Sequence, residues 1–284
     1  MTVENADFPE QRVLRSSRER NPFVVAFSDF AHGISLWRLW STLAYLEVKR
    51  RYRRTLIGPF WATGHITLYV VCVGFIFSSV LAQDREQYIL YLVSGFVPWY
   101  LIYLTLQDST GAFTSATSLR QQIAFPYSMF VFTAIWRNLI VHFHNYTLWF
   151  AVSLIYLYSP SWTIVLLIPG YILVIGNLLW LCTGIAMLTA RYRDVQQLVG
   201  AVIQIMIFVT PIFWSIDMMT HFQRVYVVTP NILYHLTNVL RAPLLGEVPS
   251  MTSYIVLTFT FLVGSLVTAY FFGKYRHRII FWII

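Results

Sequence analysis

Basic side chains that could bind an anion are concentrated in one short stretch of the sequence. Five Lys and Arg residues lie within six positions, directly after a segment in which leucine and tryptophan recur at helical spacing. Such a cluster fixes the orientation of a chain in a membrane or also binds an anionic lipid head group, and the residues leave both roles open. The five residues are Lys49, Arg50, Arg51, Arg53 and Arg54.

Residues suited to catalysis do not occur in the patterns that catalysis needs. His142 and His144 are two positions apart and so lie on different faces of a helix, and the sequence has no HExxH, CxxC or GxxxxGK[ST] motif. Cys72 and Cys182 stand in apolar stretches, where free thiols are expected. All 12 Asp and Glu lie outside or at the ends of the apolar segments, which disfavours a proton- or sodium-driven carrier. We expect no catalytic residue, metal or cofactor on this chain, so energy for any transport would have to come from another chain.

The composition excludes an ordinary soluble domain. Of the 284 residues, 57% are hydrophobic and only 11% are charged, against roughly a quarter in soluble domains. Long segments without Asp, Glu, Lys or Arg match the ~20 residues that cross a bilayer as a helix. We predict an all-α integral membrane protein with six transmembrane helices in a domain over residues 55–278. The spans are expected at about 57–82, 88–107, 128–157, 162–190, 195–215 and 251–273.

The position of the basic residues predicts the orientation of the chain. If the N-terminus is cytoplasmic, 16 of the 20 Lys and Arg fall in cytoplasmic segments, as the positive-inside rule requires. Both termini are therefore expected in the cytoplasm, and the net charge of +8 reports topology rather than nucleic-acid binding. The first 34 residues are polar, so we expect no cleavable signal peptide.

Five further segments connect or flank the predicted spans. Residues 1–34 are expected to form an N-terminal cytoplasmic segment, and 35–54 an amphipathic helix in the membrane surface. Residues 108–125 fit either a short helix that docks on a partner or a plain connector. Residues 215–250 are expected to form a periplasmic gate of short re-entrant helices, bent at Pro230 and Pro243, and 274–284 a cytoplasmic tail.

Six sequence blocks occur in an order that resembles one transporter family. Together they are similar to the membrane subunit of polysaccharide-exporting ATP-binding-cassette transporters, of the O-antigen exporter type. The resemblance extends from about residue 36 to residue 278. The blocks are RRYRRTLIGPFW (50–61), LVSGFVPWYLI (92–102), WRNLIVHFHN (136–145), ARYRDVQQLV (190–199), TPIFW (210–214) and YHLTNVLRAPLLG (234–246).

The resemblance implies a homodimer in a bacterial inner membrane, bound to two copies of a separate ATPase that carries ATP and Mg²⁺. The substrate would be a glycan on a polyprenyl pyrophosphate, received by the five basic residues above together with Arg191 and Arg193. The segment 108–125 would couple to the ATPase. Its candidate contact residues are Thr114, Ser115, Ser118 and Arg120.

Aromatic residues, which number 50, provide candidates for the wall of a glycan channel. Sugar C–H faces pack on rings through many weak contacts, which suits conduction better than one tight site. Rings also gather at membrane interfaces and face lipid, so the sequence leaves both roles open. The candidates are Trp61, Tyr69, Trp136, Phe143, Tyr146, Trp149 and Phe150.

Arg137 is a cation in the third predicted span, and no acidic residue in any span can pair with it. Either the span starts late and Arg137 is interfacial, or it lines the dimer channel and contacts phosphate or sugar hydroxyls. Asn138, His142, His144 and Asn145 follow on the same helix and would be costly against lipid, so they mark helix packing or ligand contact.

Two other functions remain compatible with the sequence. A related permease for a small lipophilic compound would have fewer channel rings, and its ATPase would lack a carbohydrate-binding domain. A membrane enzyme acting on polyprenyl lipids would work without a partner and would need carboxylates or a metal cluster in the membrane.

Overall fold

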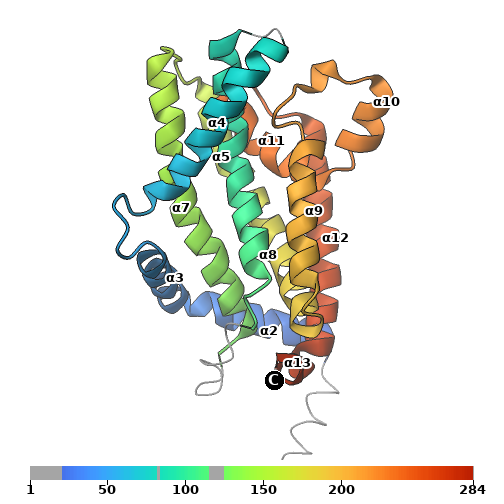
Figure 1. The fold of residues 1–284 in the computed structure, drawn as a ribbon. Coiled ribbons are helices and arrows are strands. Elements are labelled where there is room, and N and C mark those ends of the chain that lie inside the picture. Colours follow the sequence, from blue (N-terminus) through green and yellow to red (C-terminus); the bar gives the residue numbers. More distant parts are fainter. Residues whose placement is uncertain (1–20, 82–83, 115–124, 284) are drawn as a thin grey trace, which may run out of the picture.

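The computed structural model describes residues 21–81, 84–114 and 125–283, and within these ranges the chain is helical and has no strand. Figure 1 shows a bundle in which most of the longer helices run side by side along one axis, while others lie across its ends. The longer helices are α2 (Pro22–Ser35), α3 (Trp37–Arg51), α4 (Phe60–Val80), α5 (Arg85–Ser109), α7 (Tyr127–Ile155), α8 (Leu167–Arg191), α9 (Val195–Val209), α11 (Ile232–Leu244) and α12 (Met251–Tyr275).

Four helical segments are long and apolar enough to cross a membrane: Phe60–Val80, Arg85–Ser109, Trp162–Arg191 and Met251–Ile283. Helix α7 has 29 residues but falls short in hydropathy, because the polar residues between Arg137 and Asn145 interrupt its apolar sequence. Helix α9 is apolar but has only 15 residues, or about 22 Å at 1.5 Å per residue. The all-helical membrane class is therefore confirmed, and the count of six spans stays a prediction.

Helix α5 is the centre of the bundle. It packs against α4, α7, α8 and α11, and most of its residues are buried. Asp84 starts α5 by accepting hydrogen bonds from the backbone N–H groups of Glu86 and Gln87. Helices α4 and α12 lie at the periphery and expose most of their large apolar side chains, as helices that face lipid do.

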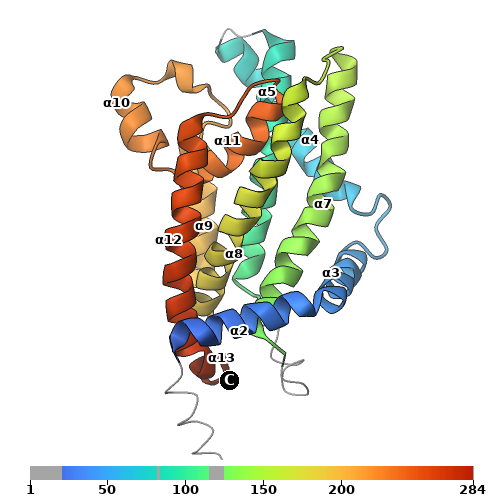
Figure 2. The same ribbon diagram turned by 180° about the vertical axis from the view of Figure 1, so that it is seen from behind.

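The N-terminal region differs from the prediction of one cytoplasmic segment followed by one surface helix. Helix α2 already begins at Pro22, with Asn21 capping the N–H of Phe23, and α3 follows after a break at Leu36. Figure 2 shows α2 crossing one end of the bundle at a steep angle to the long helices. Its buried face consists of Ala26, Asp29 and Gly33. These side chains are small or polar, whereas the apolar residues Phe23, Phe27 and Ile34, which recur at helical spacing, are exposed.

Helix α7 receives its N-terminal cap from α2. Its own N-cap residue is Pro126, which offers no side-chain acceptor. The Asp29 carboxylate instead accepts the backbone N–H groups of Tyr127 at 3.2 Å and Ser128 at 2.9 Å. A carboxylate at this position also interacts favourably with the helix dipole. Helix α2 thus holds the start of α7.

The predicted gate region, 215–250, contains one buried helix. Helix α11 lies at the end of the bundle opposite α2 and packs against α5, α8 and α12. It begins two residues after Pro230 and ends at Leu244, one residue after Pro243, so both ends of the helix lie close to a proline. The short α10 (His221–Gln223) precedes it at the same end. The insertion of this region into a membrane leaflet stays a prediction.

Candidate functional site

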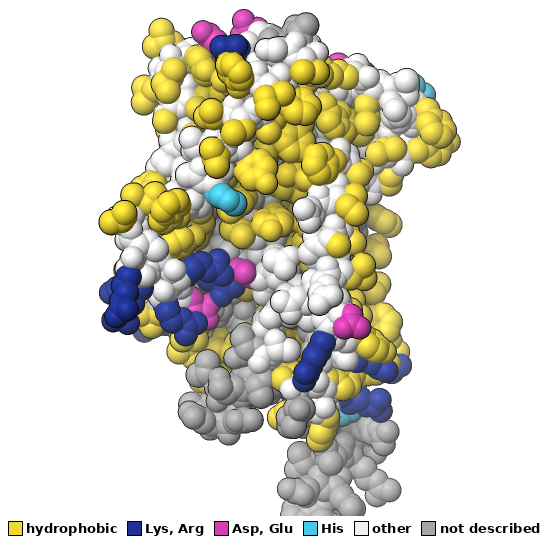
Figure 3. Space-filling view, in the orientation of Figure 1, with side chains coloured by type: hydrophobic (Ala, Val, Ile, Leu, Met, Phe, Trp, Pro, Cys, Tyr) yellow, Lys and Arg dark blue, Asp and Glu magenta, His cyan; other side chains and the backbone are white. Residues whose placement is uncertain are grey.

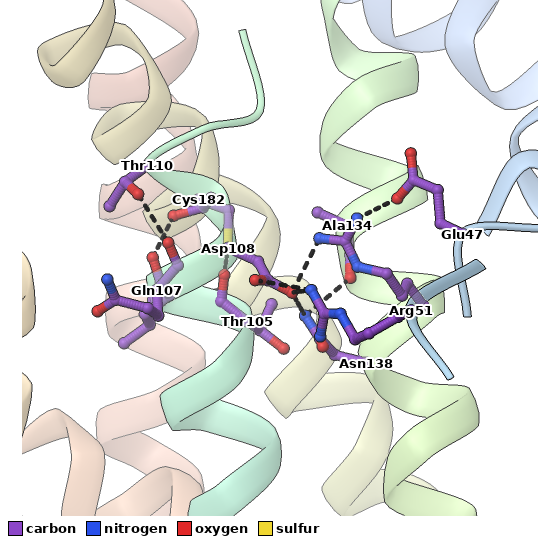
Figure 4. Close-up of polar contacts among 12 residues, drawn as sticks. Glu47, Arg51, Thr105, Gln107, Asp108, Thr110, Ala134, Asn138 and Cys182 are labelled. Atoms are coloured by element: carbon purple, nitrogen blue, oxygen red, sulfur yellow. Dashed lines mark hydrogen bonds and ion pairs between the residues drawn. The ribbon is translucent and has the colours of Figure 1, made fainter. Parts of the chain in front are cut away.

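A cluster of charged side chains joins α3, α5 and α7 (Figure 4). Arg137 of α7 forms ion pairs with Glu47 of α3 and, at 2.8 Å, with Asp108 near the end of α5. The Arg137 side chain is only 15% exposed. The polar cluster, as we call Glu47, Arg51, Asp108, Arg137 and Asn138, holds the surface helix α3 against two helices of the bundle.

The pairing of Arg137 corrects the sequence analysis, which treated it as a cation without an acidic partner. No acid lies in the middle of a span, but Asp108 stands at the end of one helix and Glu47 on the surface helix. These partners are 29 and 90 residues away in the sequence. Arg137 is therefore neutralised within the chain.

Asp108 is the common acceptor of the polar cluster, since Arg51, Arg137 and Asn138 all donate to it, and Arg137 also pairs with Glu47. It accepts hydrogen bonds from Arg51 at 3.3 Å, from Arg137 at 2.8 Å and from the amide of Asn138 at 3.0 Å. The two arginines and two acids have a net charge of zero. For Arg51 and Arg137 an external anion would have to compete with these carboxylates, since an already paired cation offers less net attraction.

The other four residues of the predicted phosphate site have a different environment. Lys49, Arg50, Arg53 and Arg54 are exposed, and no ion pair joins any of them to another described residue. We call these four the free cations. They end α3 and begin the turn to α4, in which Arg54 has a left-handed backbone with φ of 65°.

An exposed apolar segment follows the free cations directly. Leu56 is 98% exposed, and Ile57, Phe60 and Trp61 are also exposed. Cations beside uncovered apolar side chains are typical of a membrane interface, where the head group and the acyl part of an amphiphile are bound side by side. The region between α3 and α4 therefore has the chemistry to bind an anionic lipid.

Arg191 and Arg193, also predicted to bind phosphate, do not join the free cations in the single chain. Both are exposed near the C-terminus of α8, at the same end of the bundle as α3 but on another side (Figure 1). The Arg191 guanidinium lies over the rings of Tyr192 and Trp282 at 5.1 and 5.4 Å. In Figure 3 the basic side chains gather mainly at this end.

Five of the seven candidate channel rings are exposed and two are not. Trp61, Tyr69, Trp136, Phe143 and Phe150 lie on the surfaces of α4 and α7. Tyr146 is half-buried, and its hydroxyl is 2.8 Å from that of Tyr171. Trp149 is 1% exposed, and its indole N–H donates to Ser94 of α5. The structure corrects the prediction for Trp149, because an indole buried between two helices of one chain is not available to a channel.

The polar residues that follow Arg137 mostly point at neighbouring helices. His142 is buried, with one ring nitrogen 3.2 Å from the Val97 carbonyl and the other 2.6 Å from the Tyr171 hydroxyl. Asn145 accepts a hydrogen bond from Thr63 of α4. His144 is half-buried, 2.7 Å from the Ile140 carbonyl of its own helix. This face of α7 serves helix packing, in which polar pairs satisfy one another away from lipid.

Of the predicted ATPase contacts, only Thr114 belongs to the described residues. It stands just after α5, where its hydroxyl donates to the Gly111 carbonyl. Ser115, Ser118 and Arg120 lie outside the described residues.

A second arginine site, at the opposite end of the bundle, was not predicted from the sequence, which placed Arg241 in an outer segment. Arg241 of α11 is 6% exposed, and its guanidinium lies 3.4 Å from the ring centroid of Tyr91. It donates to the Pro211 carbonyl, at the turn after α9. Gly95 leaves room for it, since a Cβ there would lie 3.4 Å from the guanidinium carbon. No pattern in the sequence indicates this site, because Gly95 and Arg241 come together only when α5 and α11 pack in the folded chain.

Tyrosines of α5 secure the same turn. The Tyr88 hydroxyl donates to the Phe213 carbonyl and the Tyr91 hydroxyl to the Trp214 carbonyl, each at 2.7 Å. Side chains from α5 and α11 thus bind three carbonyls of the segment 211–214. We call this arrangement the turn clasp.

The apolar helices and the one-sided distribution of basic residues define a multi-pass membrane protein. Residues 38–245 match the ABC-2 type transporter family. The chain belongs to this family of transporter membrane proteins.

The chain is also similar in sequence to proteins named as export permeases. The chain is 22% identical over 251 residues to the O-antigen export system permease protein RfbA of Klebsiella pneumoniae, which covers 86% of this chain and 94% of that protein. It is also 22% identical over 176 residues to the protein of the same name from Myxococcus xanthus, covering 62% of this chain and 68% of that protein.

Proposed function

We propose that this chain is the channel subunit of an ATP-binding-cassette exporter for a polysaccharide linked to polyprenyl pyrophosphate. Membership of the ABC-2 family and the O-antigen export function named for its relatives support this proposal. The exporter would work in the bacterial cytoplasmic membrane, with ATP and Mg²⁺ bound by a separate ATPase.

The free cations carry the proposal for the substrate. A polyprenyl pyrophosphate joins a dianionic or more highly charged head group to an apolar tail. Lys49, Arg50, Arg53 and Arg54 are exposed and unpaired among the described residues, and the uncovered segment that begins at Leu56 follows them. The head group would bind the free cations first, and Arg51 would join only when Asp108 releases it.

The assembly we propose contains two copies of this chain and two ATPase subunits. Six spans with both termini in the cytoplasm would bring the free cations, Arg191 and Arg193 to the cytoplasmic side, consistent with the positive-inside rule. The segment after α5, with Thr114 at its start, would contact the ATPase from that side. The two basic groups, apart in one chain, would then flank the mouth of one dimeric channel.

The exposed rings of α7 support a channel wall. Trp136, Phe143 and Phe150 are seven residues apart, which places them on one stripe of the helix about 21 Å long. Trp61 and Tyr69 are exposed on the adjacent α4. Exposed rings at such intervals would give a moving glycan repeated weak contacts.

Reconstitution with the cognate ATPase tests this function. ATP turnover is measured in proteoliposomes with a polyprenyl-pyrophosphate glycan, with the glycan alone and with a small lipophilic amphiphile. We expect stimulation by the lipid-linked glycan only. Stimulation by the small amphiphile alone would instead identify a permease for lipophilic compounds.

A variant in which the four free cations are changed to Gln tests the binding site. We expect the concentration of lipid-linked glycan needed for half-maximal stimulation to rise by at least tenfold, because several charge-assisted contacts are lost. Arg224→Gln, an exposed arginine at the other end of the bundle, is the matched control. Equal responses of the two variants would contradict a head-group site at α3.

A further inference from the structure

A groove of about 370 Å³ lies between α8, α12 and the C-terminal helix α13 (Ile279–Ile283). It lies on the side of the bundle that α12 exposes. Gly184, Met187 and Leu188 of α8 form one wall. Val267 and Phe271 form the other. The lining is almost entirely apolar and contains no Asp or Glu.

Three aromatic rings contact one another in series along this groove, from α12 to α13. Phe271 stacks on Tyr275 with the ring planes 3° apart, and Tyr275 packs against Trp282 of α13 at 5.9 Å between centroids. The Arg191 guanidinium lies 5.4 Å from the Trp282 ring. The aromatic wall therefore ends at a cation.

Among the described residues, the charged side chains on and beside the aromatic wall are positive. Arg191 lines it, while Lys274 and Arg278 lie 5.6 and 6.0 Å from the Tyr275 ring. Arg191 forms no ion pair with a described residue, although Asp194 follows three positions later. A ligand that complements this groove has an apolar body and an anionic end.

The dimensions match a membrane lipid in its usual orientation. Gly184 and Arg191 are seven residues apart on α8, or about 10 Å along an upright helix. An acyl chain can therefore lie on the apolar wall while its phosphate reaches Arg191 at the end of the helix. Clusters of Lys and Arg at this depth attract anionic lipids.

We propose that the groove binds one anionic diacyl phospholipid, such as phosphatidylglycerol, from the leaflet at this end of the bundle. The acyl chain packs against Phe271 and Tyr275, and the phosphate accepts hydrogen bonds from Arg191. The lipid fills the gap between α8 and α12 and holds α13 in place. This site is separate from the free cations. It assigns Arg191 to a structural lipid, so that of the pair Arg191 and Arg193 only Arg193 would remain for the channel mouth proposed above.

Native mass spectrometry of the full chain, released from detergent with added dioleoyl phosphatidylglycerol or dioleoyl phosphatidylcholine, tests the site. The wild type is expected to retain phosphatidylglycerol in preference to phosphatidylcholine. Arg191→Gln should weaken phosphatidylglycerol retention about tenfold and leave phosphatidylcholine unaffected. Arg193→Gln, an exposed arginine two residues away that does not line the groove, is the matched control and should behave as wild type.

A second variant blocks the apolar part of the groove without changing charge. A Cβ at Gly184 meets only the Thr268 hydroxyl oxygen, at 3.9 Å, so Gly184→Leu can be accommodated and its side chain occupies the groove. It should also reduce phosphatidylglycerol retention, with unchanged thermal unfolding. The proposal is overturned if Arg191→Gln and Arg193→Gln behave alike, if the wild type retains both lipids equally, or if polyprenyl phosphate displaces phosphatidylglycerol.

Discussion

Asp29 of α2 and Arg276, directly after α12, form a 2.6 Å ion pair although 247 residues separate them. The Asp29 side chain is completely buried, and its oxygens also accept the N–H groups that start α7. One carboxylate therefore joins three helices at the end of the bundle that carries the basic residues. A Cβ at Gly273 would collide with the Pro22 carbonyl, so α2 approaches α12 as closely as a glycine permits.

Asp29→Asn is expected to destabilise the protein by about 2 to 4 kcal/mol. The change removes the negative charge that pairs with Arg276 and interacts with the α7 dipole, while an amide can accept only part of these bonds. Thermal unfolding of the purified protein measures the effect. Asp194→Asn is the control, because Asp194 precedes α9 without a side-chain capping bond. Equal unfolding temperatures for the two variants would refute the structural role of Asp29.

The ion pair between Asp108 and Arg137 is expected to show strong energetic coupling. A double-mutant cycle of Asp108→Asn and Arg137→Gln should give about 1 to 3 kcal/mol, since both side chains are largely shielded from water. The exposed pair of Arg224 and Asp217, 3.8 Å apart, should give less than about 0.5 kcal/mol in the same experiment. Similar coupling in both cycles would show that this ion pair does not hold α7 to α5.

Arg241→Met is expected to lower stability by about 2 to 4 kcal/mol. The substitution keeps much of the apolar volume but removes the cation from the Tyr91 ring and leaves the Pro211 carbonyl without its donor. Tyr91→Phe should cost only about 1 kcal/mol, because it removes one hydroxyl and keeps the ring. Denaturation with guanidinium chloride compares the two, and a larger effect for Tyr91→Phe would contradict the central position of Arg241 in the turn clasp.

His235 is expected to make stability depend on pH. Burial lowers the pKa of this imidazole below its ordinary value of 6.5. One ring nitrogen donates to the Thr229 carbonyl, so the other accepts from Ser253, and protonation would reverse the direction of that second bond and place a charge on a buried ring. Because the unfolded chain binds a proton more readily, the contribution of His235 is complete above pH 6.5 and declines as the pH falls below it.

Unfolding temperatures measured between pH 8 and pH 5 test this dependence. His235→Gln retains a donor for Thr229 and cannot titrate, so its decline over this range should be smaller than that of the wild type. Parallel curves for the two proteins would rule out a titrating role for His235. The comparison between variants removes the contribution of the other ionisable groups, which both proteins share.

Several helices could be predicted closely from local composition. The segments predicted at 88–107, 162–190 and 251–273 correspond to α5, to Trp162–Leu166 joined with α8, and to α12. The fold class follows in the same way, because the absence of charge over ~20 residues is a local property and already excludes water as the main solvent. Helix α2 was missed, although Phe23, Phe27, Phe30 and Ile34 recur in it at helical spacing.

The site could be predicted only in part. The five clustered cations were found, but their division into four free residues and a neutralised Arg51 depends on Asp108, 57 residues away. The exposure of the rings could not be predicted from the sequence either. Trp149 and Phe150 are neighbours in an apolar helix, yet Trp149 is buried against α5 and Phe150 is exposed.

The sequence by itself determined that the chain is a helical membrane protein with a basic end and no catalytic machinery of its own in any recognisable motif. Only the tertiary structure decided which charges remain free. Arg137, Arg241 and Asp29 each acquire their partners across 29 or more residues. Hydropathy reports the transfer of each segment from water, whereas ion pairs and ring exposure depend on which helices pack together, and this information is not local to any segment.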